Sequence, residues 1–195
     1  MKSGNEPPIR IVIAEDEAII RLDLRESLEA EGYIVVGETG RGDEAVKLSR
    51  TLKPDAVILD IKMPGLSGIE AAKVITDEKI AAVLLLTAFS QRDLIKDASQ
   101  AGALAYLVKP FQRSELVPSI ELAIGRFQEI VTLKKEKDDL SENLETRKVV
   151  DRAKGALMDR YGLKEKDAYR YLQKKAMEER SPMKEVAKSI VEDDQ

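Results

Sequence analysis

The chain has 195 residues, a length that suits one domain or two small ones, and it carries a net charge of −4. Cysteine and histidine are both absent, which excludes disulfides, thiolate metal sites, cysteine nucleophiles and any catalytic or zinc-binding imidazole. No apolar run approaches the roughly 20 residues of a membrane-spanning helix, and residues 1–8 are polar, unlike a secretion signal. We therefore expect a soluble, cytoplasmic protein with no membrane partner.

The charge is distributed unevenly along the chain. Residues 1–146 contain 19 basic and 26 acidic side chains, whereas residues 147–195 contain 13 basic and 10 acidic ones. This change from acidic to basic indicates two modules with different roles.

Residues 9–110 alternate between short β-branched runs and segments with helical spacing. The predicted strands are 9–14, 33–37, 56–59, 82–87 and 104–108. The predicted helices are 17–31, 41–52, 67–77 and 90–101. Three of the strands are almost wholly apolar, as central parallel strands are when helices cover both faces. The alternation predicts an α/β domain with a five-stranded, doubly wound parallel sheet.

After Pro110 the pattern is helical throughout. Residues 114–146 form one long helical pattern, with an apolar stripe that runs from Ile120 to Leu144. A solvated connector helix is one interpretation. We favour a coiled-coil dimer seam, because the apolar spacing is roughly heptad, although Lys137 interrupts it.

Residues 147–191 predict a small all-α unit of three helices, 148–161, 165–179 and 183–191. Ala168 and Leu172 lie four residues apart, which permits a close helix–helix contact. Tyr169 and Tyr171 are interpreted as core or groove-lining residues in preference to aromatic platforms for bases.

Chemistry-bearing side chains follow four of the five predicted strands. Glu15 and Asp16 follow the first strand, Asp60 the third, Thr87 ends the fourth and Lys109 follows the fifth. Alone, each is more typical of a helix cap or a loop. Because the carboxyl ends of parallel strands meet at one edge, we expect them to converge there. Such carboxylates suit Mg²⁺, with Lys109 opposite, and Asp60 becomes a candidate nucleophile toward a phosphoryl group.

Residues 8–125 resemble the receiver domain of two-component response regulators, which has a flavodoxin-like fold. The resemblance rests on Glu15-Asp16, the run from Asp60 to Gly65, Gly68, Thr87-Ala88, Gly102-Ala103, Tyr106 and Lys109-Pro110-Phe111. It implies that Asp60 accepts a phosphoryl group from a sensor histidine kinase and that Lys109 contacts that group. It also implies that Glu15, Asp16, Asp60 and the backbone carbonyl of Lys62 hold Mg²⁺. Thr87 and Tyr106 would form the switch pair.

A DNA-binding output and a protein-interaction output are the alternatives for the basic C-terminal unit. Its basic residues are spread over all three helices and do not gather on one recognition helix, as a helix-turn-helix would need, so a solvated charged face is also open from composition alone. Residues 147–191 nevertheless resemble an ANTAR domain, the RNA-binding module of transcription antitermination regulators. The resemblance rests on Arg147, Ala153-Lys154-Gly155, Leu157-Met158, Tyr161-Gly162, Ala168, Leu172, Ala176-Met177 and Val186-Ala187. Residues 126–146 then form a helical or coiled-coil linker.

Together the two resemblances imply a regulator, not a turnover enzyme, although its receiver would catalyse its own phosphorylation and slow dephosphorylation. Phosphorylation at Asp60 would promote a homodimer that binds stem-loops in a nascent transcript and causes antitermination. Lys154, Arg160 and Lys164 are the candidate RNA contacts. Ala153 and Gly155 allow either a close approach of the RNA backbone or helix packing. The target transcripts, the cognate kinase and the state of the unphosphorylated form do not follow from the sequence.

Overall fold

The computed structural model describes residues 7–88 and 101–192. The contacts within it divide the chain into two units, Met1–Val131 and Thr132–Gln195. The helix predicted over residues 90–101 lies outside the described residues, apart from Ala101. In the described part of the chain, no helix combines the length and the apolar character that are needed to cross a bilayer.

The first unit is built on a five-stranded parallel sheet with the strand order β2-β1-β3-β4-β5. The strands are β1 (Arg10–Ala14), β2 (Ile34–Thr39), β3 (Ala56–Asp60), β4 (Ala82–Ala88) and β5 (Ala105–Lys109). Every neighbouring pair runs parallel. The predicted doubly wound α/β fold is confirmed, and this strand order is the flavodoxin-like one.

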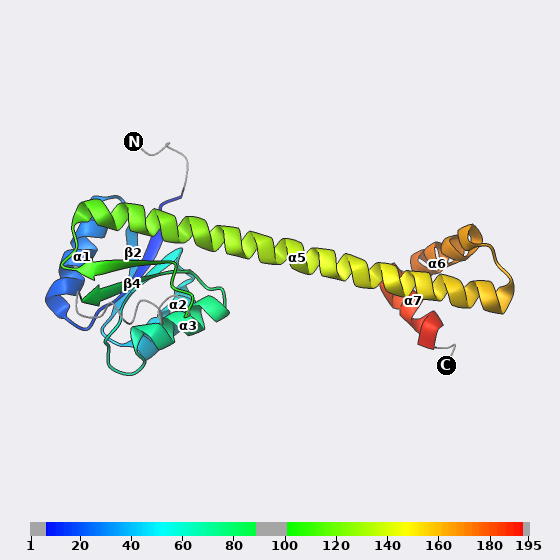
Figure 1. Cartoon of the computed structure of the whole chain (residues 1–195), viewed down its shortest axis with the longest axis horizontal. Coiled ribbons are helices and arrows are strands. Elements are labelled where there is room, and N and C mark those ends of the chain that lie inside the picture. Colours follow the sequence, from blue (N-terminus) through cyan, green and yellow to red (C-terminus); the bar gives the residue numbers. More distant parts are fainter. Residues whose placement is uncertain (1–6, 89–100, 193–195) are drawn as a thin grey trace. The chain divides into compact units, whose positions relative to one another are not determined.

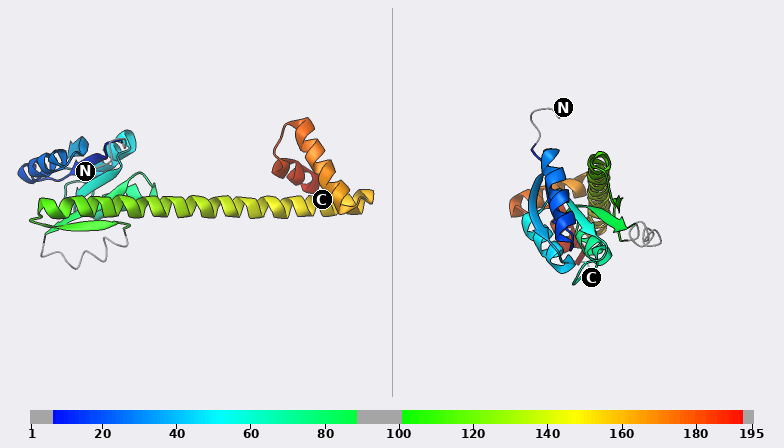
Figure 2. Two further views of the ribbon diagram at one scale, coloured as in Figure 1. Left: turned by 90° about the horizontal axis from the view of Figure 1, so that it is seen from above. Right: turned by 90° about the vertical axis from the view of Figure 1, so that its left-hand side faces the viewer.

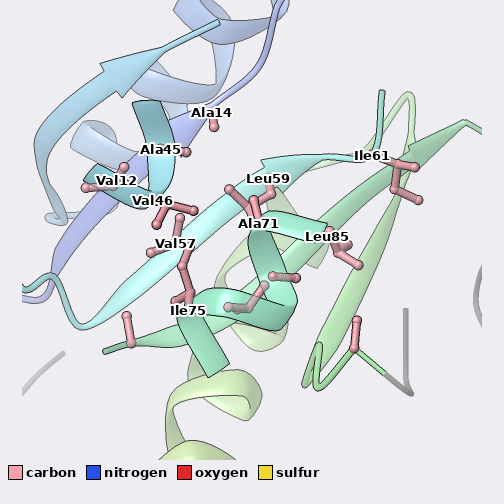
Figure 3. Close-up of a cluster of buried hydrophobic side chains, with 14 residues drawn as sticks. Val12, Ala14, Ala45, Val46, Val57, Leu59, Ile61, Ala71, Ile75 and Leu85 are labelled. Carbon is pink, nitrogen blue, oxygen red and sulfur yellow. The ribbon is translucent and has the colours of Figure 1, made fainter. Parts of the chain in front are cut away.

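Alternate residues of the central strands supply two separate hydrophobic cores. Val12, Val57 and Leu85 lie in the cluster that packs against α2 (Gly42–Leu52) and α3 (Gly68–Asp77), drawn in Figure 3. Their neighbours in sequence, such as Ile13 and Ile58, lie in the cluster on the other face. That cluster packs against α1 (Ala18–Ala30) and the beginning of α5 (Arg113–Tyr161). Burial on both faces explains why these strands are almost continuously apolar.

α5 is one helix of 49 residues and has no break at residue 147, where the sequence analysis expects separate helical segments (Figure 1). The reason is local, since no glycine or proline occurs between residues 126 and 154. The apolar stripe of this helix changes its surroundings along its length. Leu116 and Ile120 are fully buried against the sheet, and Phe127 still packs on that cluster. Ile130, Leu133, Leu140 and Leu144 are between 47% and 65% exposed.

The second unit consists of the C-terminal end of α5 together with α6 (Glu165–Glu179) and α7 (Met183–Glu192), seen in Figure 2. Ala168 and Leu172 are fully buried in its core, as predicted. Ala153 is also fully buried there, so its small side chain serves helix packing. Of the two roles predicted for Tyr169 and Tyr171, core packing or groove lining, the core role is wrong. Both are 44% exposed, because helical spacing does not show which face of α6 a partner helix covers.

The loop between β3 and α3 is fixed tightly against the end of β3. Ser67 caps α3 in a reciprocal pair with Glu70, and the Gly68 amide donates to the Ile61 carbonyl over 2.9 Å. A Cβ atom at Gly68 would lie 2.0 Å from the backbone oxygen of Asp60. Glycine at this position therefore lets α3 begin in contact with the strand that carries Asp60.

The Gly68→Ala variant should lower the free energy of unfolding by about 1–3 kcal/mol, because backbone must move to admit the methyl group. Urea denaturation measures the loss. Gly125→Ala is the matched control, since Gly125 lies within α5 and a Cβ there meets nothing within 4 Å. It should raise stability by about 0.5–1 kcal/mol through helix propensity. Wild-type stability in Gly68→Ala would contradict the close contact.

Candidate functional site

The strand ends bring Glu15, Asp60 and Lys109 into direct contact. The ammonium of Lys109 lies 2.6 Å from Asp60 Oδ1 and 3.0 Å from Glu15 Oε2. Glu15 is fully buried and Asp60 is 6% exposed, so the two carboxylates have little access to water. The predicted convergence of these three residues at the carboxyl edge of the sheet is therefore present in the structure.

Asp16 completes an acidic cluster at this edge. One carboxylate oxygen from each of Glu15, Asp16 and Asp60 lies within 4.8 Å of the other two. Asp16 is exposed, and it lines a surface pocket together with Lys62 and Met63 of the β3–α3 loop. Three carboxylates against one ammonium leave an excess of negative charge. An open cluster of hard oxygen donors suits Mg²⁺, which keeps several of its water ligands.

Backbone groups fix the orientation of these carboxylates. Asp60 Oδ2 accepts a hydrogen bond of 3.1 Å from the Lys62 amide, and Glu15 Oε1 accepts one of 3.3 Å from the Glu17 amide. The Arg21 guanidinium also donates to the backbone carbonyl of Glu15. Sequence reasoning missed Arg21. The available signal was its position in the first turns of the helix that follows the acidic pair.

The carboxylate of Glu15 and the ammonium of Lys109 each affect the pKa of the other. Burial raises the pKa of Glu15, the nearby charge of Asp60 adds to this, and the hydrogen bond from Lys109 opposes it. For Lys109, burial acts to lower the pKa. The hydrogen bonds and charges of Asp60 and Glu15 outweigh burial, so the pKa of Lys109 is raised. Lys109 therefore remains a cation at neutral pH.

Thr87 and Tyr106 lie on adjacent strands and differ in exposure. Thr87 pairs in register with Val108, and Tyr106 pairs with Leu85, so both side chains belong to the sheet face that holds Leu85. Thr87 is 1% exposed and its hydroxyl donates to the Ala88 carbonyl over 3.1 Å, whereas Tyr106 is 49% exposed. A buried hydroxyl thus lies near the carboxyl end of β4, and a half-exposed ring lies on the same sheet face in the neighbouring strand, three residues before Lys109.

The three candidate RNA contacts lie in the second unit, and their side chains have different surroundings. The ammonium of Lys154 lies 2.8 Å from Asp151 and 2.8 Å from Glu165. The hydrogen bonds that its ammonium donates to Asp151 and Glu165 raise the pKa of Lys154. Arg160, near the end of α5, and Lys164, which precedes α6, are both exposed. Lys154 is thus already engaged within the protein.

Comparison with known families decides the class of the chain. The model of the response regulator receiver domain matches residues 11–121, and that of the ANTAR domain matches residues 138–191. The chain belongs to the response regulator family. In this response regulator, the matched receiver domain contains the acidic cluster of Glu15, Asp16 and Asp60.

Relatives of this response regulator fall into two groups. The transcriptional regulatory protein PdtaR of Mycobacterium tuberculosis is 55% identical over 185 residues, which cover 95% of this chain and 90% of PdtaR. The chemotaxis protein CheY of Thermotoga maritima is 38% identical over 112 residues, which cover 57% of this chain and 93% of CheY. The first shares both domains, whereas the second is similar to the receiver alone.

Among solved structures, the receiver domain of the sensor histidine kinase PA1611 from Pseudomonas aeruginosa carries a magnesium ion coordinated in its active-site cleft. It is 28% identical, with a TM-score of 0.55, and the match covers 61% of this response regulator and 99% of that domain.

Replacing Lys109 with Met should lower the free energy of unfolding by about 1–3 kcal/mol in metal-free buffer, because Glu15 and Asp60 would keep their charges without a counterion. The loss should be largest above the raised pKa of Glu15. It should shrink as the pH falls through that pKa, because protonation removes one of the two charges. Denaturation at several pH values measures it.

Arg25→Met is the control for Lys109→Met, since it removes an exposed cation that pairs with Glu29 and Glu38 at the surface. Exposed ion pairs contribute little, so its effect should be much smaller and nearly independent of pH over the same range. Equal losses in the two variants would contradict the dependence of the buried carboxylates on Lys109.

Proposed function

We propose that this response regulator is controlled by phosphorylation of Asp60, and that the phosphorylated form dimerises and binds structured RNA through its ANTAR domain. The bound RNA can then not form a terminator hairpin, and transcription continues. The observation that carries the proposal is the contact of Lys109 with Asp60 and Glu15 in the same chain as an ANTAR domain.

The proposed phosphotransfer uses the carboxylate of Asp60 as the nucleophile. A carboxylate oxygen attacks phosphorus on a phosphohistidine, and an acyl phosphate forms as the P–N bond breaks. The imidazole leaves and takes up a proton from solvent. Because this chain contains no histidine, the donor belongs to another molecule, which we assign as a sensor histidine kinase. Lys109 lies 2.6 Å from Asp60 and supplies a cation for the charge that the phosphoryl group brings.

The donor set of the acidic cluster fits Mg²⁺. Glu15, Asp16, Asp60 and the backbone carbonyl of Lys62 would hold the ion, which neutralises charge on a transferring phosphoryl group when it is bound. The protein contributes positioning, since the amide of Lys62 orients Asp60 and Lys109 binds both buried carboxylates. We propose that the receiver catalyses its own phosphorylation and slow dephosphorylation, and that the protein is not a turnover enzyme.

Thr87 and Tyr106 are the proposed switch pair. A phosphoryl group adds about −1.5 to −2 charges beside Lys109, and the hydroxyl of Thr87 can donate a hydrogen bond to one of its oxygens. Its hydrogen bond to the Ala88 carbonyl would be exchanged for one to the phosphoryl group. Tyr106, half-exposed on the neighbouring strand, would then turn inward. The change is local in origin and alters the surface around β5.

The exposed apolar stripe of α5 supports the proposed homodimer. Ile130, Lys137 and Leu144 are seven residues apart, as are Leu133 and Leu140, so all five occupy the a and d positions of one heptad pattern. The four apolar members are between 47% and 65% exposed. A second copy of the chain would cover them. Two ANTAR domains in one dimer would bind paired stem-loops with higher avidity than one domain alone.

The basic residues of the second unit support RNA as the partner, because phosphate contacts supply much of the affinity for nucleic acids. The resemblance of residues 147–191 to an ANTAR domain, now matched by the family model, carries the choice of RNA. Since the proposed partner is a nascent transcript, we place the activity in the cytoplasm.

The Asp60→Asn variant should take up no label from radioactive acetyl phosphate with Mg²⁺, whereas the wild type should be labelled. The amide cannot act as the nucleophile, although it keeps the shape of the side chain. Asp23→Asn is the control, since it removes an exposed carboxylate from α1 and should leave labelling unchanged. Normal labelling of Asp60→Asn would overturn the assignment of Asp60.

Mobility shifts with structured RNA and duplex DNA separate this function from its alternatives. The wild type treated with beryllofluoride should shift structured RNA, with an affinity that falls as salt rises. A shift with duplex DNA only would indicate a DNA-binding regulator. If it shifts neither nucleic acid, a protein-interaction output is favoured.

Replacing Lys137 with Leu should strengthen the beryllofluoride-dependent dimer at least about tenfold, because the substitution makes the heptad seam continuously apolar. Leu140→Lys should weaken the dimer. Lys135→Leu is the control, since position 135 lies off the seam and the change in side chain is the same. Light scattering measures the mass, and equal masses for all three variants would contradict this seam.

A further inference from the structure

The outer face of α6 carries a set of exposed side chains with a common helical spacing. Apart from one adjacent pair, Tyr169 and Arg170, successive members are three or four residues apart, so they lie on one side of the helix. We call this set the α6 stripe; it consists of Lys166, Tyr169, Arg170, Gln173 and Met177. Tyr169 is 44% exposed and Met177 is 74% exposed.

The α6 stripe plays no part in the core of its own unit. The residues of α6 that are buried in that core, Ala168 and Leu172, lie on a different side of the helix. α6 packs through them against the end of α5 and against α7. Two cations, an aromatic ring and an amide outside that core are therefore available to a partner.

The charges of α6 are sorted so that the stripe is positive. α6 has four acidic residues, Glu165, Asp167, Glu178 and Glu179, and none of them belongs to the stripe. Glu178 and Glu179 lie 3.6 Å and 3.8 Å from the ammonium groups of Lys174 and Lys175. Within the described part of the chain, neither Lys166 nor Arg170 forms an ion pair, so both cations are free to meet an anion.

Lys154 contributes to this sorting from α5. Glu165 precedes Tyr169 by one helical turn, so its carboxylate flanks the stripe. The ammonium of Lys154, 2.8 Å from the Glu165 carboxylate, holds that carboxylate against α5. Lys154 is thus a positioning residue that neutralises a negative charge beside the stripe. This role differs from the direct RNA contact that the sequence suggests for it.

We propose that the α6 stripe is the surface on which the ANTAR domain binds RNA, with Tyr169 stacking on an unpaired base and Lys166 and Arg170 contacting the flanking phosphates. This inference rests on the proposed function, which supplies RNA as the partner. An exposed ring beside two cations that form no ion pair among the described residues fits a single-stranded loop, since base faces are accessible only where bases are unstacked. Gln173 adds a donor and an acceptor for a base edge. Duplex DNA hides its base faces and would leave the ring of Tyr169 without a partner.

The test uses the full chain with Mg²⁺ and beryllofluoride, and RNA hairpins that share one stem and carry a randomised loop. A hairpin selected by the wild type serves as the probe for the variants. Tyr169→Ala should weaken binding about 5- to 150-fold, whereas Tyr169→Phe, which keeps the ring, should remain close to the wild type. Lys166→Ala and Arg170→Ala should each reduce the slope of log affinity against log salt by about 0.7–0.9.

Two further variants separate a binding role from damage to the fold. Asp167→Asn removes the remaining carboxylate that flanks the stripe, so it should tighten binding, a gain that a damaged domain cannot produce. Lys188→Ala removes one positive charge from α7, where Lys188 pairs with Glu185, and it should change binding little. Thermal melting of each variant reports whether the unit remains folded.

The outcomes distinguish this inference from the proposed function. If the wild type binds a selected hairpin and the Tyr169, Lys166 and Arg170 variants bind it equally well, the α6 stripe is wrong and RNA binding stands. If the wild type selects no hairpin, both the inference and RNA as the partner are overturned. If the Tyr169, Lys166 and Arg170 variants lose binding to blunt duplex DNA as much as to the hairpin, the inference is also overturned, because the stripe would then contact only the phosphate backbone.

Discussion

A single ammonium, that of Lys109, lies between two carboxylates that the fold has removed from water. Glu15 directly follows β1 and Asp60 ends β3, and their charges would repel without Lys109 between them. Polar side chains at the carboxyl edge of the sheet replace few apolar contacts. The same side chains within the strands would replace residues of the two hydrophobic cores. The arrangement is stable and yet has an excess of negative charge once Asp16 is included.

An arrangement of this kind responds strongly to added charge. A phosphoryl group on Asp60 would replace one carboxylate charge by a larger one within reach of the same ammonium and of the buried hydroxyl of Thr87. The energetic change is concentrated at the ends of β3, β4 and β5, and Tyr106 lies on the last of these strands. A local change in charge can shift the equilibrium between two conformations of this edge of the sheet. If one conformation dimerises through the seam on α5, dimerisation would stabilise that conformation further.

The sequence predicts the receiver well because its signals are local and redundant. Apolar runs identify central strands, the residues directly after them must lie at the carboxyl edge, and this placed Glu15, Asp60 and Lys109 together without a structure. The ANTAR unit is harder to predict. Helical spacing gives a face but does not say whether another helix covers it. Of the core and groove-lining roles predicted for Tyr169 and Tyr171, the core role therefore fails, because both side chains are exposed.

The pairing of Lys154 with Glu165 shows the same limit. These residues are eleven positions apart and separated by a turn, so no helical spacing relates them, and only the packed unit brings them to 2.8 Å. The continuity of α5 through residue 147 depends on the absence of a helix-breaking residue, a weaker signal than a proline or a glycine. Basic residues that look equivalent in the sequence thus differ in the fold: Lys154 forms ion pairs within the protein, whereas Lys166 and Arg170 are exposed.

The central claim is that the charge state of Asp60 governs the affinity of the chain for folded RNA. Its most direct measurement is the dissociation constant of the full chain for one RNA stem-loop pair at fixed salt, with Mg²⁺ alone and after addition of beryllofluoride. We expect an at least about tenfold tighter complex with beryllofluoride, a coupling of roughly 1.4 kcal/mol. Equal affinities in the two conditions, with beryllofluoride shown to be bound, would contradict it.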